Sequence, residues 1–235
     1  MNLINGDCLE KMKDLSDNSI DIIIADLPYG RFKHLDWDKK IDLEKMWKEI
    51  WRICKINSPV FLFGDFKFAN ILLNSQPKYF KYEIVWRKEK TTTPFLSQKR
   101  FGKVTEYILV FYKKRPVYNY AKYHKILKIE EAPFAILGKE RKKCRANRYS
   151  PPLPINIIVC PNKKKDKLIK NITEKPQSIL EHLLKYFSNE GDICLDMCMG
   201  SGSMGVACKT LNRKFICIEL KKEHFDIAKK RLTTK

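Results

Sequence analysis

A carboxylate, a stiff backbone and an aromatic ring follow one another at Asp26, Leu27, Pro28 and Tyr29. They come directly after three isoleucines and an alanine at 22–25, a run typical of a strand buried on both faces of a parallel sheet. Pro28 has no N–H and restricts Leu27 to an extended backbone, so the strand must end there. Ligands of open α/β sheets bind at the carboxyl ends of strands, which favours a ligand site here. The alternative is an Asp-Pro turn between a strand and a loop.

A second group of residues points to a nucleotide. Asp196 ends an apolar stretch, and Gly200, Gly202 and Gly205 follow with G-x-G-x-x-G spacing before a helical pattern. Glycines permit a tight turn there and let the backbone approach a ligand closely. Glu219 ends the next expected strand, where an acid can accept hydrogen bonds from ribose hydroxyls. These residues predict a cofactor that contains adenosine; the alternative is a helix–strand crossing that merely needs small residues.

The order of the two motifs is unusual. Nucleotide-binding α/β proteins usually begin with the glycine loop, whereas here it comes last, with one strand and one helix after it. The first strand of the fold is therefore expected near the C-terminus, with the strand at 22–25 beside it in space. Both ligand-binding strand ends then face one cleft.

The elements that position these residues alternate between strands and helices, which predicts a doubly wound, mostly parallel α/β sheet. We expect strands at 3–4, 22–25, 60–63, 82–87, 106–112, 193–197 and 215–219. Helices are expected over 9–15, 42–54, 66–73, 173–187, 203–211 and 222–232. Asp42 and Thr173 are predicted to cap helices, with Pro176 in the first turn after Thr173. The composition of 91–102 suits a mobile surface loop.

The net charge of +20 and the pI near 9.6 favour a polyanionic partner, most simply nucleic acid, over a surface charged only for solubility. Residues 113–170 hold 17 Lys and Arg against 4 Asp and Glu, with tyrosines interleaved. Basic and aromatic residues together suit phosphate contacts and base stacking. The residues expected to contact nucleic acid are Lys99, Arg100, Arg141, Lys142, Lys143, Arg145 and Arg148.

The eight cysteines contain no C-x-x-C pair, and histidine is too scarce and scattered for a zinc site, so we expect no metal. Most cysteines lie in apolar runs and are predicted to be buried free thiols, which suits a reducing compartment. The N-terminal residues lack the pattern of a signal peptide, and no apolar run reaches the length of a membrane span. We therefore expect a cytoplasmic protein without a membrane contact.

Taken together, the motifs resemble those of the S-adenosylmethionine-dependent amino-methyltransferases of DNA, and their order resembles the beta group. The family pattern D-P-P-Y is matched at 26–29, with Leu27 in place of the first proline. The other matching segments are G-D-C-L-E at 6–10, T-E-K-P at 173–176, L-D at 195–196, G-S-G-S at 200–203, F-I-C-I-E at 215–219 and A-K-K-R-L at 228–232. Met197-Cys198 and Asn171-Ile172 depart from the family's Pro-Phe and His-Pro. The similarity covers about 1–112 and 171–233.

This resemblance implies a circularly permuted, Rossmann-like methyltransferase fold with S-adenosylmethionine as cofactor. The carboxylate of Asp26 and the carbonyl of Leu27 would accept hydrogen bonds from an exocyclic amine, and Tyr29 would stack on its base. The base would be flipped out of duplex DNA. Aspartate at the head of the motif leans toward adenine N6, with cytosine N4 as the alternative. The cofactor contacts implied are Asp7, Thr173, Lys175, Asp196, Gly200, Gly202 and Glu219.

Three segments are expected: a catalytic part at 1–112, a basic target-recognition insert at 113–170 and a cofactor-binding part at 171–235. Rival interpretations are a DNA-binding subunit without turnover and a nicotinamide-dependent oxidoreductase, which would leave the Asp26 motif and the basic insert unexplained. Methylation of protein glutamine is disfavoured by the order of the motifs. The sequence leaves open an RNA substrate and the oligomeric state, a homodimer included.

Overall fold

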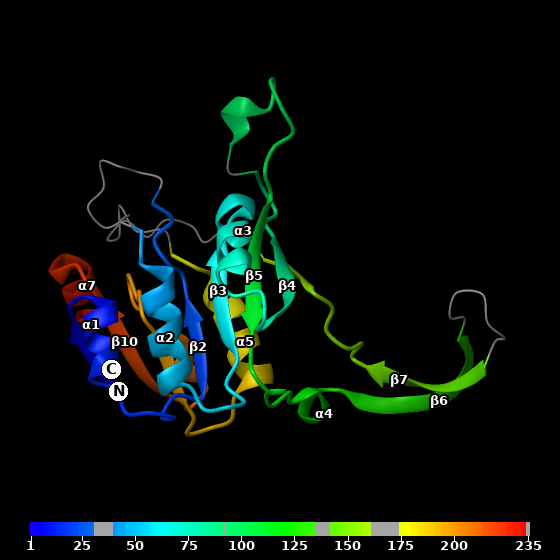
Figure 1. The fold of residues 1–235 in the computed structure, drawn as a ribbon. Helices are drawn as coiled ribbons and strands as arrows, with labels where there is room; N and C mark the ends of the chain where they lie inside the picture. Colours follow the sequence, from blue (N-terminus) through cyan, green and yellow to red (C-terminus); the bar gives the residue numbers. More distant parts are fainter. Residues whose placement is uncertain (31–39, 92, 135–141, 161–173, 234–235) are drawn as a thin grey trace. The chain divides into compact units, whose positions relative to one another are not determined.

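The computed structural model describes residues 1–30, 40–91, 93–134, 142–160 and 174–233 (Figure 1). For residues 127–134 and 142–148 this description covers the backbone and not the side chains. The chain forms two compact units. Residues 1–117 and 156–235 make up the larger one, and Tyr118–Ile155 the smaller one.

Eight strands of the described residues form the sheet of the larger unit, in the order β1-β10-β9-β2-β3-β5-β4-β8. Their bounds are β1 Asn2–Asn5, β2 Ile22–Ala25, β3 Val60–Gly64, β4 Phe80–Arg87, β5 Thr105–Phe111, β8 Ile157–Val159, β9 Ile193–Asp196 and β10 Lys214–Glu219. Neighbours from β1 to β3 are parallel, β5 is antiparallel to β3 and β4, and β8 is parallel to β4. The mostly parallel sheet is confirmed. The late strand β9 lies beside β2, as the order of the motifs predicts, and β10 lies between β9 and β1.

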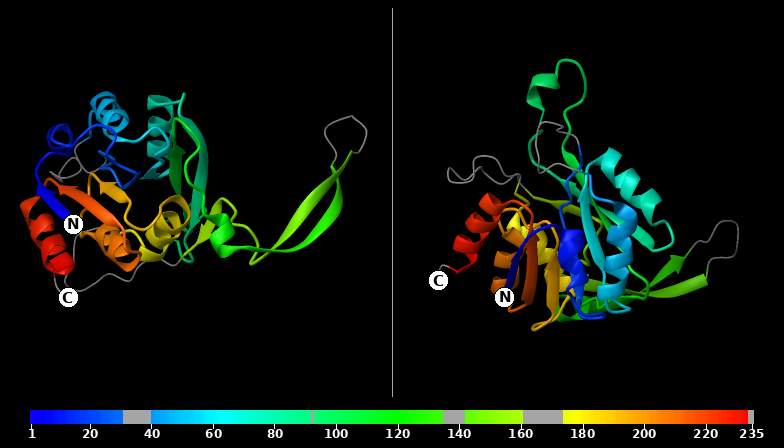
Figure 2. Two further views of the ribbon diagram at one scale, coloured as in Figure 1. Left: turned by 90° about the horizontal axis from the view of Figure 1, so that it is seen from below. Right: turned by 60° about the vertical axis from the view of Figure 1, so that its left-hand side comes forward.

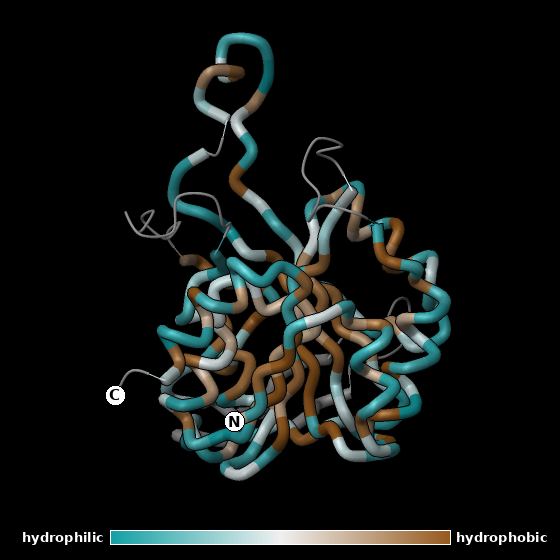
Figure 3. Tube along the Cα trace, turned by 90° about the vertical axis from the view of Figure 1, so that its left-hand side faces the viewer, coloured by the Kyte–Doolittle hydropathy of each residue, from teal (hydrophilic) through white to brown (hydrophobic). Residues whose placement is uncertain are grey.

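Helices cover both faces of this sheet (Figure 2). Their bounds are α1 Cys8–Lys13, α2 Leu43–Ile53, α3 Phe66–Ser75, α5 Gln177–Phe187, α6 Ser203–Thr210 and α7 Lys222–Thr233. The first three pack into one apolar cluster and the last three into another. Strand β2 serves both clusters, because Ile22 and Ile24 belong to one and Ile23 and Ala25 to the other. This strand is thus buried on both faces, and Figure 3 shows the apolar residues gathered along the strands.

Aspartates begin two of the helices that follow the parallel strands. Asp42 Oδ1 accepts a hydrogen bond from the Lys45 N–H at 3.1 Å, which confirms the predicted cap of α2. Asp65 Oδ1 accepts from the Phe68 N–H at 3.0 Å at the start of α3. Each carboxylate satisfies one of the N–H groups that the first turn of a helix leaves without an intrahelical partner.

The start of α5 differs from the prediction. Pro176 was expected inside the first turn, but its ψ of 129° is extended, so it is the N-cap and the helix begins at Gln177. Thr173, the predicted cap, lies outside the described residues. The sequence also predicts a buried stripe at 179, 180, 183, 184 and 187. The first four of these residues are buried, and Phe187 is partly buried against the same apolar cluster.

The described residues of the connection from β4 to β5, 88–91 and 93–104, protrude from the larger unit (Figures 1 and 3). Gly64 at the end of β3 pairs with Tyr107 near the start of β5, so the connection rises at the carboxyl end of β3. It contains a short 3₁₀ helix, Pro94–Leu96. Phe95 is 77% exposed and Phe101 is fully exposed at 101%. The connection thus presents two aromatic rings on its surface.

The smaller unit is built on a hairpin that the sequence analysis did not predict. Strands β6 (Lys125–Phe134) and β7 (Lys142–Ser150) are antiparallel, and the short helix α4 (Tyr120–Tyr123) precedes them. The predicted insert at 113–170 is therefore not uniform, because β8 belongs to the sheet of the larger unit.

Candidate active site

Three carboxylates lie at the carboxyl ends of neighbouring strands. Asp196 ends β9, Glu219 ends β10, and Asp26 directly follows β2. Since β10, β9 and β2 are adjacent and parallel, their ends share one edge of the sheet. Asp196 and Glu219 are buried, at 7% exposure each, and the Asp26 side chain is 24% exposed. The fold thus brings the two motifs together, as their order in the sequence predicts.

Backbone N–H groups hold the two buried carboxylates. Asp196 Oδ1 accepts a hydrogen bond from the Cys198 N–H at 3.1 Å. Glu219 Oε2 accepts from the Gly200 N–H at 2.9 Å, and Oε1 accepts from the Lys221 N–H at 2.9 Å. The glycine loop is therefore tied directly to the end of the next strand.

Gly202 occupies a position that only glycine fills without strain. It is the N-cap of α6 and has φ of +80°, in the left-handed region. A Cβ atom there would lie 3.0 Å from Leu232 Cδ1 and 3.2 Å from Ala228 Cβ. The glycine spacing thus serves both a turn and a close approach to α7.

Burial, opposed by the hydrogen bond from the Cys198 N–H and assisted by the charges of Asp26 and Glu219, raises the pKa of Asp196 to about 8. A buried cluster of carboxylates favours a ligand that carries positive charge or hydrogen-bond donors. The end of the sheet is thus suited to a cationic ligand with hydroxyl groups.

Asp7 lies beside the same edge of the sheet. The pairing of Asn5 with Glu219 and the hydrogen bond from the Gly6 N–H to the Glu219 carbonyl, 2.9 Å, place it next to the end of β10. Its carboxylate caps α1 by accepting from the Leu9 N–H at 2.8 Å, and the residue is exposed. Thr173, expected in the same role, lies outside the described residues.

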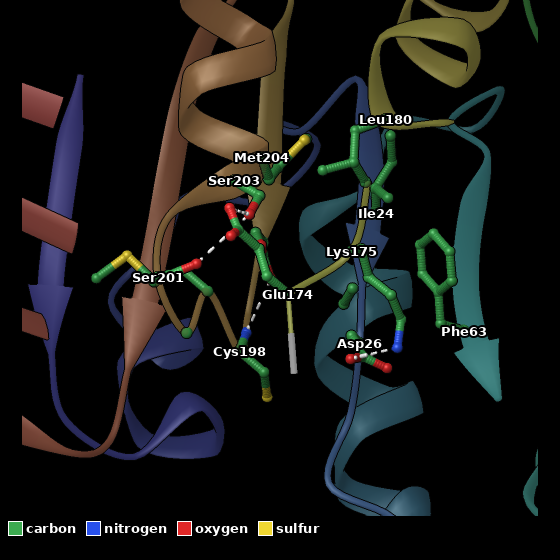
Figure 4. A pocket seen from close by; sticks show the side chains of 14 residues that line it. Ile24, Asp26, Phe63, Glu174, Lys175, Leu180, Cys198, Ser201, Ser203 and Met204 are labelled. Carbon is green, nitrogen blue, oxygen red and sulfur yellow. Dashed lines mark hydrogen bonds and ion pairs between the residues drawn. The ribbon is translucent and has the colours of Figure 1, made fainter. Parts of the chain in front are cut away.

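Lys175 forms the ion pair at the centre of the site (Figure 4). Its Nζ lies 2.7 Å from Asp26 Oδ2, and its side chain is 12% exposed. The preceding Glu174 accepts hydrogen bonds at Oε1 from Ser203 Oγ at 2.6 Å and from Arg231 Nη1 at 2.5 Å. These bonds fix the backbone that presents Lys175 to the pocket. Lys175 was expected on the cofactor, and its pairing with Asp26 was not foreseen.

A pocket runs from this ion pair to the glycine loop. Its lining includes Asp26 and Lys175 at one end and Asp196, Gly200 and Ser203 at the other. Figure 4 shows Lys175 pointing to Asp26 and Glu174 pointing to Ser203 across the pocket. One ligand site therefore contacts both motifs.

Sequence reasoning missed Glu106, at the start of β5. Its Oε2 lies 3.4 Å from Lys175 Nζ, and its Oε1 pairs with Lys88 Nζ. Lys88 also lies over the Trp86 ring, 4.6 Å from its centre. Asp196 and Glu219 end their strands, whereas Glu106 stands at the amino end of β5 and reaches the same edge of the sheet only because β5 is antiparallel to β3. Its partner Lys175 also lies far away in the sequence.

The pKa values of this buried charge cluster follow from burial and pairing together. Burial raises the pKa of Asp26, and the Lys175 ammonium opposes that shift only in part. Burial alone would raise the pKa of Glu106, but Lys175 and Lys88 together hold it below its ordinary value. Burial alone would lower the pKa of Lys175, but Asp26 and Glu106 raise it, so the lysine is charged.

Tyr29 is fixed beside Asp26. Its hydroxyl donates a hydrogen bond to Asp26 Oδ1 at 3.1 Å, and its ring stacks on Phe68 with centres 4.7 Å apart. Leu27, between β2 and Pro28, is buried at 2% exposure. The tetrapeptide is thus packed as a unit at the end of β2.

The residues expected to contact nucleic acid are divided between the two units. Lys99 and Arg100 are exposed on the connection between β4 and β5. The backbone of β7 carries Lys142, Lys143, Arg145 and Arg148, whereas Arg141 lies outside the described residues.

None of the helices in the described parts of the chain has the length and apolar character that crossing a membrane requires. Within the same residues, no three His, Cys, Asp or Glu side chains are placed together to hold a metal ion. The seven cysteines described are free thiols, and all except Cys198 are buried, which confirms the prediction for them.

Comparison with known proteins identifies the family. The model of the N6/N4 DNA methylase family matches residues 20–230, which include both motifs. The chain belongs to this family. It is a DNA methyltransferase of the N6-adenine or N4-cytosine type, and its cofactor is S-adenosylmethionine.

Curated relatives match along nearly the whole chain. It is 28% identical to the Type II methyltransferase M.HpaI of Haemophilus parainfluenzae over 98% of its own length and 73% of that protein. It is 25% identical to the DNA adenine methyltransferase YhdJ of Escherichia coli over 98% of its length and 82% of that protein.

Solved structures share the fold. The complex of M1.HpyAVI with S-adenosylmethionine matches with a TM-score of 0.69 and 26% identity, over 99% of both chains. The cytosine-N4-specific PvuII DNA methyltransferase matches with a TM-score of 0.73 over 99% of this chain and 86% of that one. At 14% identity the second likeness concerns the fold alone.

The residues at the sheet edge fit S-adenosylmethionine. The cofactor carries a positive sulfonium, an ammonium group and ribose hydroxyls. The buried carboxylates of Asp196 and Glu219 are the acceptors that such groups require. Gly200 lines the pocket and has φ of +52°, so the backbone can come close to the ligand there without a side chain in the way.

Proposed function

We propose that this protein transfers a methyl group to the N6 amine of an adenine flipped out of duplex DNA. The observation that carries the proposal is the shared pocket, in which the Asp26 carboxylate and the glycine loop line one space. A methyl donor on the glycine loop and an amine on Asp26 would lie within reach of each other there.

The roles of the residues follow from the chemistry of an exocyclic amine. Its lone pair is delocalised into the ring, so it is a poor nucleophile. The Asp26 carboxylate and the Leu27 carbonyl accept its two N–H bonds, which favours a pyramidal nitrogen with its lone pair aimed at the methyl group. The cofactor supplies that methyl group from its sulfonium, whose carbon–sulfur electron pair returns to sulfur. The Asp26 carboxylate is also the nearest base for the proton that the methylated nitrogen releases, and its raised pKa suits that task.

Two observations favour adenine. Aspartate stands at the head of the Asp26 motif, and the relative from Escherichia coli is named a DNA adenine methyltransferase. Cytosine N4 would use the same pocket and the same hydrogen bonds.

Access to the amine requires base flipping, because a duplex hides it. The protruding connection offers exposed Phe95 and Phe101 with Lys99 and Arg100 at the same edge of the sheet as Asp26. Aromatic rings beside basic residues suit stacking on bases next to phosphate contacts. The basic hairpin of the smaller unit is proposed to choose the target sequence.

The decisive experiment identifies the methylated base. Purified protein is incubated with methyl-labelled S-adenosylmethionine and mixed-sequence duplex DNA, and the DNA is digested to nucleosides for mass spectrometry. Labelled N6-methyladenine is expected. N4-methylcytosine would preserve the mechanism and overturn the choice of base. Absence of label in DNA, with cofactor binding intact, would overturn the proposal in favour of an RNA substrate or a subunit without turnover.

A further inference from the structure

The Lys175 ammonium occupies the place that the proposed function assigns to the target amine. It donates to Asp26 Oδ2 at 2.7 Å, and it lies 6.0 Å from the centre of the Tyr29 ring, on which the base would stack. An ammonium and an exocyclic amine are both N–H donors, so they compete for the same carboxylate. The inference below rests on the proposed function.

Glu106 offers a second position for this ammonium. Its Oε2 is 3.4 Å from Lys175 Nζ and accepts no well-aligned hydrogen bond from the residues that the structure describes. Its Oε1 is paired with Lys88, which packs over Trp86, so the carboxylate is held in place with Oε2 toward Lys175. A small rotation of the lysine side chain would bring Nζ from Asp26 to Glu106.

The positive charge of Lys175 explains why a second acceptor is needed. Lys175 is 12% exposed, and leaving a buried ammonium without a partner is costly. If the amine displaced it from Asp26 with no other carboxylate nearby, that cost would count against base binding. With Glu106 in reach, the ammonium stays paired, and Asp26 becomes a stronger acceptor for the amine.

We propose that Glu106 is a positioning residue that receives the Lys175 ammonium when the target amine takes its place on Asp26. Lys175 then acts as an occupant of the empty pocket that the base must displace. The alternative is a fixed ion-pair cluster that only holds the segment after residue 173 against the sheet.

The test compares single-turnover methylation at saturating DNA and cofactor in Glu106→Gln, Glu106→Asp and the wild type. Glutamine keeps the shape and removes the charge, so Lys175 should remain on Asp26 and the rate should fall about tenfold or more. Aspartate keeps the charge and should restore part of the rate. Cofactor affinity, measured by calorimetry, should stay within about twofold of wild type in both variants.

A double variant separates exchange from mere structure. Lys175→Met removes the occupant, so adding Glu106→Gln to it should change the rate by less than about twofold, whereas independent effects would multiply. Glu83→Gln on β4 is the matched control, because it makes the same charge change on the same sheet away from Lys175, and it should keep the wild-type rate.

Two results would overturn the exchange. One is a wild-type rate in Glu106→Gln, and the other is a loss of rate that multiplies with that of Lys175→Met or follows a loss of cofactor affinity. Absence of methyl transfer in the wild type itself would refute the proposed function, which distinguishes the two failures.

Discussion

The two ends of the pocket hold their carboxylates in different ways. At the cofactor end, Asp196 and Glu219 accept hydrogen bonds from backbone N–H groups of the glycine loop and the turn after β10. At the amine end, Asp26 and Glu106 are paired with lysine side chains. Backbone donors are fixed by the fold, whereas a lysine side chain has four rotatable bonds and can change partners. The cofactor end is thus prepared in advance, and the amine end is built for exchange.

Asp26→Ala should separate the two ends most strongly. It removes an acceptor of the amine, so the single-turnover rate should fall about 100-fold or more. Cofactor affinity should stay within about threefold, because Asp26 lies outside the backbone-held end. Asp226→Ala is the control and should keep the rate, because this carboxylate is exposed on α7. A variant at Asp26 that still methylates DNA would show that the motif is not the amine site.

Asp196→Asn should have the opposite pattern. Asparagine keeps an oxygen for the Cys198 N–H but cannot ionise opposite the cationic cofactor, so the affinity for that cofactor should fall about tenfold. Binding of duplex DNA should be unchanged. Equilibrium dialysis with labelled cofactor and fluorescence anisotropy with labelled DNA measure the two separately. Equal cofactor affinity in both proteins would place the cofactor elsewhere.

Gly202→Ala tests how rigid the backbone-held end is. Gly202 and Gly191 both have positive φ, +80° and +82°, so alanine is strained at either position by about 1 kcal/mol. An added Cβ would meet Leu232 and Ala228 at Gly202, but nothing within 4 Å at Gly191. Gly202→Ala should therefore be less stable than Gly191→Ala by about 1 kcal/mol in urea denaturation, and it alone should weaken cofactor binding. Equal effects would mean that α7 yields to the added methyl group.

The same contrast explains what could be predicted from the sequence. Asp196, Gly202 and Glu219 lie within 24 residues of one another in the sequence. Because strand–turn–helix geometry is local, their spacing was sufficient to predict the cofactor end of the pocket. The three isoleucines before Asp26 likewise predicted a strand buried on both faces, which β2 is. Local pattern was sufficient wherever the partners were close in the chain.

The amine end depends on contacts that no local pattern reports. Lys175 meets Asp26 and Glu106 only because β2, β3 and β5 are neighbours and β5 runs antiparallel. The strand at 106–112 was predicted without its direction, so the side on which Glu106 would stand was unknown. The hairpin of β6 and β7 escaped for the same reason, because its pairing is set between strands rather than within them.

The pH dependence of stability gives the finest comparison of the two ends. The folded-state pKa of Asp196 is raised from 3.8 to about 8, so the folded protein binds this proton more tightly than the unfolded chain does. Stability therefore falls as the pH rises through that window, and it levels off above about 8. In urea denaturation, the free energy of unfolding of Asp196→Asn should therefore exceed that of the wild type by a margin that grows as the pH rises from 3.8 to about 8.

Glu106 should behave in the opposite sense. Lys175 and Lys88 lower its pKa, so its ionised form stabilises the fold at neutral pH, and this contribution is lost as the pH falls below the ordinary value of 4.5. The free energy of unfolding of Glu106→Gln should be lower than that of the wild type at neutral pH, and this difference should shrink as the pH falls. If the free energy of unfolding changed with pH in the same way in the wild type, Asp196→Asn and Glu106→Gln, the two ends would hold their carboxylates alike. Opposite slopes would show that backbone donors leave Asp196 ready for a cation from the ligand, whereas at Glu106 the protein supplies the cation itself.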